Sequence, residues 1–201
     1  MSGQFDAYSE AVLKRTAESK QVLSVYLSSS DQGTFILGIV LGVSATHFAM
    51  GSISSTGCED GCLIAPISDI YKIEFEDEYI TGINLLFENR DLRKLGDFES
   101  WQQIRSLAAE HAFSDYMSVL ALLRANHRLV NLFAYDGASI YGFVTEFGSG
   151  YVELDVVSDN GLRDGSVGID LETIRKIEFG TSCEIAIEKL CGLRPARMNR
   201  E

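Results

Sequence analysis

The sequence contains little proline, little tryptophan and no long apolar run. Its 201 residues include two prolines and one tryptophan. With so little proline and no low-complexity stretch, no segment has a composition that predicts disorder. The longest apolar run, Phe35 to Val43, is interrupted by Gly38 and Gly42. It is far shorter than the roughly 20 residues that span a membrane as a helix, so a membrane partner is not expected.

Basic residues are also in deficit. The chain has 29 acidic and 17 basic residues, which gives a formal net charge of -12. A polyanion that approaches such a surface is repelled unless basic side chains gather on one face. DNA is therefore not an expected partner, and RNA could be bound only through a local basic patch.

An export signal is missing, and cysteines are few. The first six residues have neither a basic region nor an apolar core, so no signal peptide is expected. We therefore predict a cytoplasmic protein whose cysteines are reduced thiols. These are Cys58, Cys62, Cys183 and Cys191.

What the sequence does contain is an internal repeat. The hexamer Ile70 to Phe75 (IYKIEF) returns as Ile174 to Phe179 (IRKIEF), 104 residues later. Further matches at the same offset are Gly33 with Gly137, Ile36 with Ile140, Gly38 with Gly142, Val40 with Val144, and Asp60-Gly61 with Asp164-Gly165. Such a series, without a gap, indicates one small domain written twice.

Hydrophobic periodicity and turn signals predict a helix followed by five short strands in each copy. The first copy is expected to hold a helix at Tyr8 to Lys20, strands at Val22 to Leu27, Phe35 to Val43 and Thr46 to Ile53, a loop at Ser54 to Cys62, a tight helical turn at Ile67 to Ile70, a strand from Ile73, and a fifth strand at Tyr79 to Phe87. A turn is expected at Ser28 to Gly33.

The second copy is predicted in the same way. It is expected to hold a helix at Tyr116 to Ala125 capped by Ser114-Asp115, strands at Leu129 to Phe133, Ser139 to Thr145 and Tyr151 to Val157, a tight helical turn near Leu171 to Ile174, and a fifth strand at Glu184 to Leu190. Between the copies, Phe98 to His111 reads as a helix. Its stripe of Trp101, Ile104 and Leu107 could bind a partner, or pack on its own domain as such stripes more often do.

Several stretches of the second copy follow one known pattern. They are Val130-Asn131-Leu132, Asp136-Gly137, Ile140 to Val144, and Tyr151 to Val157 followed by Asp159-Asn160-Gly161. Together they resemble the first half of an Sm-like (LSm) domain. The resemblance implies a helix followed by a strongly bent five-stranded antiparallel barrel, with the family's strand-two glycine at Gly142 and Gly38. Independently, a small barrel closes only where its strands kink, which explains a glycine there.

Two loops depart from the family members that bind RNA. Those members carry an acidic-apolar-Asn loop between strands two and three, where this chain has Ser44 to His47 and Phe147 to Gly150. They also carry a basic turn between strands four and five. We assign that place to Phe75 to Glu78, which is acidic, and to Phe179 to Ser182, which is neutral. The resemblance therefore does not extend to uridine-type recognition.

Candidate metal ligands are Cys58 and Cys62, with His47 as a third. A structural zinc site needs four ligands, and the second copy has Arg163 and Ser166 near the two cysteine positions. The alternative is a plain loop with two thiols. The histidines, His47, His111 and His127, are scattered, and no serine or cysteine stands in a nucleophile-elbow setting near them. Neither an enzyme nor a cofactor is predicted.

The candidates for ligand or RNA contact are aromatic and basic. They are Tyr135, Tyr151, Arg163, Arg175, Arg194 and Arg197. The arginines near the C-terminus form the one basic cluster of the sequence, and a frayed, solvated terminus is the alternative.

Two repeated features have simple interpretations. Asp60-Gly61 and Asp164-Gly165 could supply a carboxylate pair, but Asp-Gly is first of all a turn former. In both hexamers a glutamate follows a lysine at the alternate position, as Lys72-Glu74 and Lys176-Glu178. This spacing predicts a solvated charge pair on one face of a strand.

We predict a mainly β protein with helices, built of two tandem Sm-like barrels, each five-stranded, bent, antiparallel and preceded by a helix. The first spans residues 1–90, a helical connector spans 91–115, and the second spans 116–201. The predicted function is a non-catalytic binding or scaffolding module that acts by protein interaction or self-assembly, because barrels of this family pair edge to edge into rings. RNA binding through a basic patch and small-ligand sensing are the alternatives.

Overall fold

The computed structural model describes residues 3–27, 35–88 and 115–193. These residues form ten strands, four α-helices and two short 3-10 helices, so the protein is mainly β with helices, as predicted. The expected turn at residues 28–33, the expected helix at residues 98–111 with its Trp101 stripe, and most of the predicted connector lie outside the described residues. The predicted domain boundaries stay a prediction.

The first half of the described chain runs from α1 to α2. Its elements are α1 (Gly3–Ser19), β1 (Val22–Leu27), β2 (Ile36–Val43), β3 (His47–Ile53), β4 (Glu59–Pro66), η1 (Ile67–Asp69), β5 (Ile70–Glu74) and α2 (Glu78–Glu88).

The second half repeats this order. Its elements are α4 (Tyr116–Ala125), β6 (Leu129–Ala134), β7 (Ser139–Phe147), β8 (Tyr151–Val157), β9 (Arg163–Asp170), η3 (Leu171–Thr173), β10 (Ile174–Phe179) and α5 (Ser182–Leu193). The hexamer Ile70 to Phe75 therefore forms β5 and the residue after it, and the hexamer Ile174 to Phe179 forms β10.

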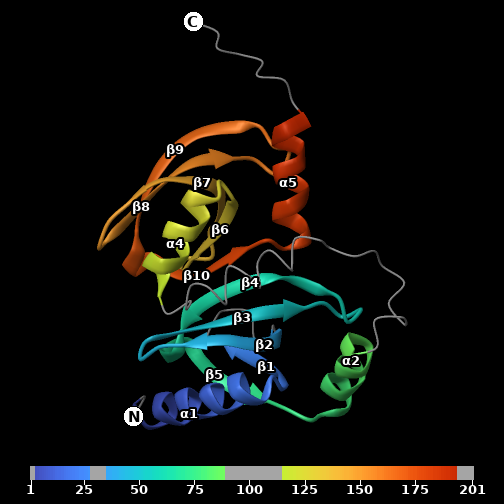
Figure 1. Cartoon of the computed structure of the whole chain (residues 1–201). Helices are drawn as coiled ribbons and strands as arrows, with labels where there is room; N and C mark the ends of the chain where they lie inside the picture. Colours follow the sequence, from blue (N-terminus) through green and yellow to red (C-terminus); the bar gives the residue numbers. More distant parts are fainter. Residues whose placement is uncertain (1–2, 28–34, 89–114, 194–201) are drawn as a thin grey trace, which may run out of the picture.

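All ten strands belong to one open antiparallel sheet with the order β5-β1-β2-β3-β4-β10-β6-β7-β8-β9. The five strands of each half are contiguous in this order, and the pairing of β4 with β10 joins them (Figure 1). Among the described strands, β5 and β9 are the two ends of the sheet.

Gly38 and Gly142 occupy equivalent surroundings. Gly38 lies opposite Ser52 across the β2–β3 pair, and Gly142 lies opposite Val156 across the β7–β8 pair. A Cβ added at Gly38 would lie 2.1 Å from the carbonyl oxygen of Gly51, and one added at Gly142 would lie 2.8 Å from that of Asp155. Both sites thus need a residue without a side chain, because the neighbouring strand passes too close.

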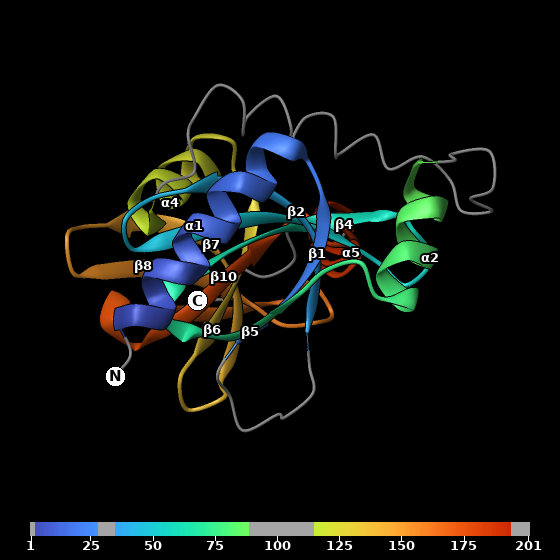
Figure 2. The same ribbon diagram turned by 90° about the horizontal axis from the view of Figure 1, so that it is seen from below.

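Each half has its own main apolar core. In the first half, α1 covers strands through Leu13, which packs with Leu23, Phe48, Met50 and Leu63. In the second half, α4 supplies Val119, Leu120 and Leu123 to a cluster with Val130, Leu132, Val152 and Leu154. Figure 2 shows α1 lying over the strands of the first half, with α2 at a separate place.

The predicted helix Tyr116 to Ala125 is confirmed, and so is its cap. The Asp115 side chain accepts a hydrogen bond from the backbone N–H of Ser118 at 2.8 Å. The buried side chains of Tyr116, Val119 and Leu123 recur at helical spacing, which is the pattern that a helix with one covered face requires.

The predicted fifth strand of each copy is wrong. Tyr79 to Phe87 lies in helix α2, and Glu184 to Leu190 lies in helix α5. In α2 the buried residues Ile80 and Ile83 are three apart, and in α5 Glu184 and Ile187 are also three apart. Residues three apart lie on the same face of an α-helix, which has about 3.6 residues per turn, but on opposite faces of a strand. Ile185 and Ile187 alternate around Ala186 as they would in a strand, but only Ile187 is buried.

The predicted loop from Ser54 to Cys62 is also wrong in its second part, because β4 begins at Glu59. The five strands of each half are complete with β4 and β9, which the expected pattern omitted. Consequently Phe75 to Glu78 and Phe179 to Ser182 do not join strands four and five. They join β5 to α2 and β10 to α5, and the 3-10 helices η1 and η3 make the connections between strands.

A bulge interrupts the alternation of buried residues in β8. Val152 and Leu154 are fully buried, but the next buried residue is Val157 and not Val156, which strict alternation would place there. The pairing of β8 with β9 shifts register between Asp155 and Val157. Such a shift places one extra residue in the strand and reverses the alternation beyond it.

Candidate functional site: the strand edges

The pairing of β4 with β10 shows how these halves bind an additional strand. The register places Ile64 opposite Ile177, Leu63 opposite Glu178, and Cys62 opposite Phe179. Backbone hydrogen bonds between the two strands join parts of the chain more than 100 residues apart. We call this contact the junction.

Apolar side chains support the junction on one face of the sheet. Ala49 from β3 and Cys62 and Ile64 from β4 are fully buried, and they belong to the core cluster of the second half. The first half thus completes the core of the second.

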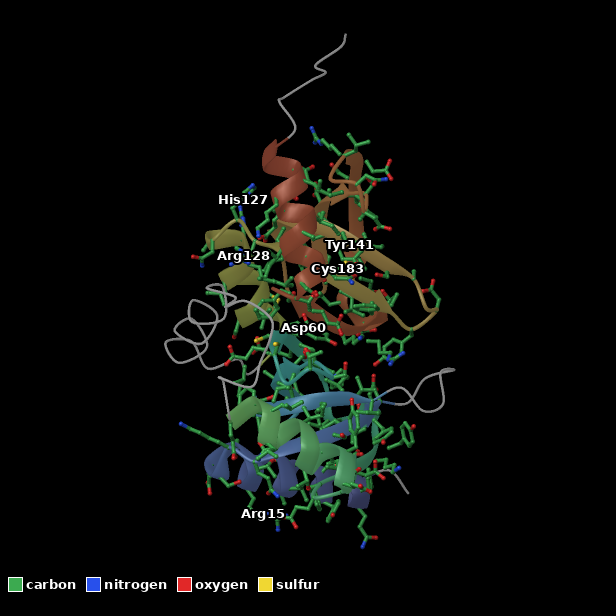
Figure 3. The ribbon with its side chains drawn as sticks, turned by 90° about the vertical axis from the view of Figure 1, so that its right-hand side faces the viewer. Arg15, Asp60, His127, Arg128, Tyr141 and Cys183 are labelled. Carbon is green, nitrogen blue, oxygen red and sulfur yellow. The ribbon has the colours of Figure 1, made fainter. Side chains whose placement is uncertain are left out.

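Asp60 and Gly61 fix the end of the junction. An Asp60 carboxylate oxygen accepts a hydrogen bond from the backbone N–H of Ser182 at 2.9 Å, at the first residue of α5. Asp60 lies between the two halves in Figure 3. Gly61 has φ +74°, and a Cβ added there would lie 2.5 Å from the nitrogen of Thr181. The carboxylate satisfies an N–H at the start of the helix, where negative charge is favourable.

Two further contacts cross from one half to the other. The Tyr135 hydroxyl donates a hydrogen bond to Asp69 at 2.9 Å, and burial raises the pKa of Asp69 while this bond and Arg175 oppose the rise. The rings of His47 and Tyr116 meet edge to face, with centroids 4.5 Å apart. Burial lowers the pKa of His47, so this imidazole favours its neutral form.

The two hexamers lie in different environments although their sequences are nearly the same. In β10, Ile177 and Phe179 are buried, whereas their counterparts Ile73 and Phe75 are half-buried. The predicted lysine–glutamate pairs are present in both places. The pair in β10 joins Lys176 to Glu178 at 2.5 Å, with 15% and 21% of the side chains exposed. The pair in β5 joins Lys72 to Glu74 at 2.6 Å, with 46% and 32% exposed. The difference follows from position, because β10 lies between β4 and β6, whereas β5 has a described neighbour, β1, on one side only.

Aromatic side chains line the surface beside β5. Ring centroids are 5.9 Å apart for Tyr26 and Tyr71, 5.4 Å for Tyr26 and Phe35, and 5.7 Å for Phe35 and Tyr79. Tyr71 and Tyr79 are each nearly half exposed. The Lys72 ammonium lies 4.4 Å from the centre of the Tyr26 ring. A row of this kind offers large contact area with polar ends, which suits an interface.

Glu74 holds Tyr26 in this row. The Tyr26 hydroxyl donates a hydrogen bond to the Glu74 carboxylate at 2.5 Å. This bond, together with burial, raises the pKa of Tyr26 to about 12, so the hydroxyl remains a donor at neutral pH.

The opposite end of the sheet, β9, is polar. Most of its residues are exposed, among them Asp164, Ser166 and Gly168. Gly165 has φ +91°, and no heavy atom lies within 4 Å of an added Cβ. The equivalent residue of β4, Gly61, is pressed against the second half, so the exposure of Gly165 again reflects the lack of a described neighbour on that side.

The predicted binding residues do not gather at one place. Tyr135 lies near Arg175 and Asp69 at the junction. Tyr151 donates a hydrogen bond to Glu146 at 2.7 Å at the start of β8, and Arg163 pairs with Asp155 at 2.9 Å on β9. Arg194 and Arg197 lie outside the described residues.

The thiol and histidine candidates are likewise dispersed. Cys58 and Cys62 are both buried, and Cys62 contributes to the junction. His127 stacks on Phe143 with ring centroids 4.6 Å apart, while His111 lies outside the described residues. Within the described ranges no three His, Cys, Asp or Glu side chains are grouped in a way that could hold a metal ion.

Sequence reasoning missed the residues that matter at the edges. Asp60 was interpreted as part of a turn, whereas its carboxylate binds the other half of the chain. The signal was present, because Asp60-Gly61 is repeated as Asp164-Gly165. Tyr26, Tyr71 and Tyr79 come from β1, β5 and α2, so only the fold brings them together.

Comparison with known proteins gives no relative: no protein-family model, no curated protein and no solved structure matches the chain. None of the helices in the described residues has both the length and the apolar character needed to cross a membrane.

Proposed function

We propose that the chain is a non-catalytic scaffolding module, made of two Sm-like barrels, that binds other proteins by pairing strands at the ends of its sheet. Each half contains a helix followed by five antiparallel strands, with a glycine at the same close approach in its second strand. These features support the Sm-like reading. In that family, barrels assemble by pairing one strand edge with another.

One observation carries the proposal. At the junction the β10 hexamer has β6 on one side and β4 on the other, whereas the corresponding hexamer in β5 pairs with β1 on one side and has no described strand on the other. Ile73 and Phe75 are only partly buried apolar side chains that a paired strand would cover further, whereas their counterparts Ile177 and Phe179, beside β4, are buried. An exposed edge of this kind is a template for a further strand.

RNA binding receives less support from the described residues. Arg163 forms an ion pair with Asp155, and the positive charge of Arg175 opposes the rise that burial causes in the pKa of the Asp69 carboxyl. The candidate cations are therefore placed beside carboxylates, and the free edge near β5 carries three acidic residues, Glu76, Asp77 and Glu78.

The test uses a peptide with the sequence of residues 59–66, which is the strand that β10 already binds. We expect this peptide to slow hydrogen exchange of the backbone amides of residues 70–75 in the full chain, because a paired strand satisfies the N–H groups of the edge. A scrambled peptide of the same composition is the control. Protection confined to residues far from β5 and β9, or no protection by any strand peptide, would refute edge pairing.

A further inference from the structure

Within the described residues the sheet ends at β5 and β9, so we ask whether β9 of one copy pairs with β5 of another. The repeat supplies the answer, because the junction is a template for such a contact. At the offset of 104 residues, β9 corresponds to β4 and β5 corresponds to β10. The turn geometry agrees: Glu76 has φ +63° and its counterpart Gly180 has φ +68°. A second copy that placed β9 on β5 would therefore bring Asp164 to the place that Asp60 holds at the junction.

The charges at that place are wrong for self-pairing. At the junction, Asp60 meets the uncharged turn Gly180-Thr181-Ser182 and accepts a hydrogen bond from Ser182. Beside β5 the same turn is Glu76-Asp77-Glu78, and all three side chains are exposed. An Asp164 carboxylate would enter a group of three like charges, which weakens such an interface.

A second difference between the two hexamers also makes the β5 edge more negative than the β10 edge. Burial raises the pKa of Asp69, a residue of the first half, and the positive charge of Arg175 in β10 opposes this rise. The residue of β5 at that position is Tyr71. The β5 edge has therefore lost one cation and gained three anions relative to the β10 edge.

The apolar support is also missing from β9. At the junction Ala49, Cys62 and Ile64 enter the core of the second half. The equivalent residues of the second half are Glu153, Ser166 and Gly168, and none of them is buried. Neither charge nor apolar area would thus hold β9 on β5.

We propose, on the basis of the function proposed above, that β5 takes a strand of a different protein, and that this strand carries a basic residue where β4 carries Asp60 and apolar residues where β4 carries Cys62 and Ile64. The basic side chain faces Glu76, Asp77 and Glu78. The apolar side chains cover Ile73 and Phe75, whose counterparts Ile177 and Phe179 are buried at the junction. The two ends of the sheet serve different partners, and the chain does not polymerise through them.

The test compares two peptides of residues 59–66, one with the natural Asp60 and one with Asp60→Lys. Binding to the full chain is measured by fluorescence anisotropy, and its location by hydrogen exchange at residues 70–75. At low ionic strength we expect the lysine peptide to bind β5 about tenfold more tightly or better, and the difference to shrink in high salt because exposed charges are screened.

A graft of the neutral turn supplies the matched control. The variant Glu76→Gly, Asp77→Thr, Glu78→Ser copies Gly180 to Ser182 into the first half, so its backbone conformation is one that this fold already uses. We expect the graft to abolish the preference for the lysine peptide.

Equal or tighter binding of the Asp60 peptide than of the lysine peptide to β5 of the natural chain would overturn this inference. So would a concentration-dependent polymerisation of the natural chain, measured by sedimentation velocity, if the variant Asp164→Lys changed its extent. Edge pairing itself would survive both results. If neither peptide protects β5, the proposed function fails, and the inference fails with it.

Discussion

Two glycines in equivalent positions differ in what surrounds them, and this difference can be measured. Gly61 and Gly165 both have positive φ, but only Gly61 has backbone atoms close to an added Cβ. Gly165→Ala should lower the free energy of unfolding by about 1 kcal/mol through backbone strain alone. Gly61→Ala should cost about 3 kcal/mol, since crowding against Thr181 adds to that strain.

Urea unfolding of the two variants measures the difference directly. Equal destabilisation would mean that the junction does not hold Gly61 as close to the second half as the structure shows.

Glu184 is a buried carboxyl whose pKa is raised, chiefly by burial, with Glu178 and Asp60 adding to the rise. A carboxyl with a raised pKa in the folded state stabilises the fold below its ordinary pKa of 4.5, and this contribution is lost as pH rises through the folded value. Glu184→Gln should therefore raise the melting temperature at pH 7, because the amide oxygen can still accept the Thr181 N–H that the carboxylate accepts at 2.8 Å.

Melting curves from pH 4 to pH 8 check this expectation. The advantage of Glu184→Gln should disappear toward pH 4. An advantage of constant size at every pH would show that it does not come from titration of this carboxyl.

At the scale of single elements, the helix α4 depends on its cap. Asp115→Ala removes the acceptor for the Ser118 N–H and should lower stability by about 1 kcal/mol. Asp115→Asn is the matched control, because asparagine caps nearly as well. Chemical unfolding followed by circular dichroism distinguishes them, and equal losses for both variants would show that the cap is not the cause.

Local elements were predicted well where the local pattern was unambiguous. The strand at Val22 to Leu27, the helix at Tyr116 to Ala125 and the strand at Tyr151 to Val157 have the predicted bounds. The segments read as fifth strands failed because short apolar runs fit both periods, and packing against the sheet decided for a helix. The strand β4 was missed because its first residues, Glu59 to Gly61, resemble a turn in isolation.

At the scale of the whole molecule, the junction should unite the two halves in one unfolding unit. Ile64 is fully buried between them. Ile64→Asp places a charge in that core and should cost about 4 kcal/mol or more, with the two halves then melting separately. Gly168→Asp, at the equivalent exposed position of β9, should change stability by less than about 0.5 kcal/mol.

Differential scanning calorimetry is the measurement for this pair. Two transitions in Ile64→Asp and one in Gly168→Asp are expected. A single transition in both variants, at similar temperatures, would contradict the role given to the junction.

The amino-acid sequence by itself determined the duplication, the mainly β character and the two equivalent glycines, Gly38 and Gly142. These follow from matches at a fixed offset and from hydrophobic periodicity, both of which can be read along the chain. It could not show that Asp60 binds the start of α5, or that Lys72-Glu74 is exposed while Lys176-Glu178 is largely covered. Those outcomes depend on which strand lies beside which, across more than 100 positions of chain. Only tertiary structure sets that neighbourhood, and so only it decided which of the two hexamers has a described strand on both sides.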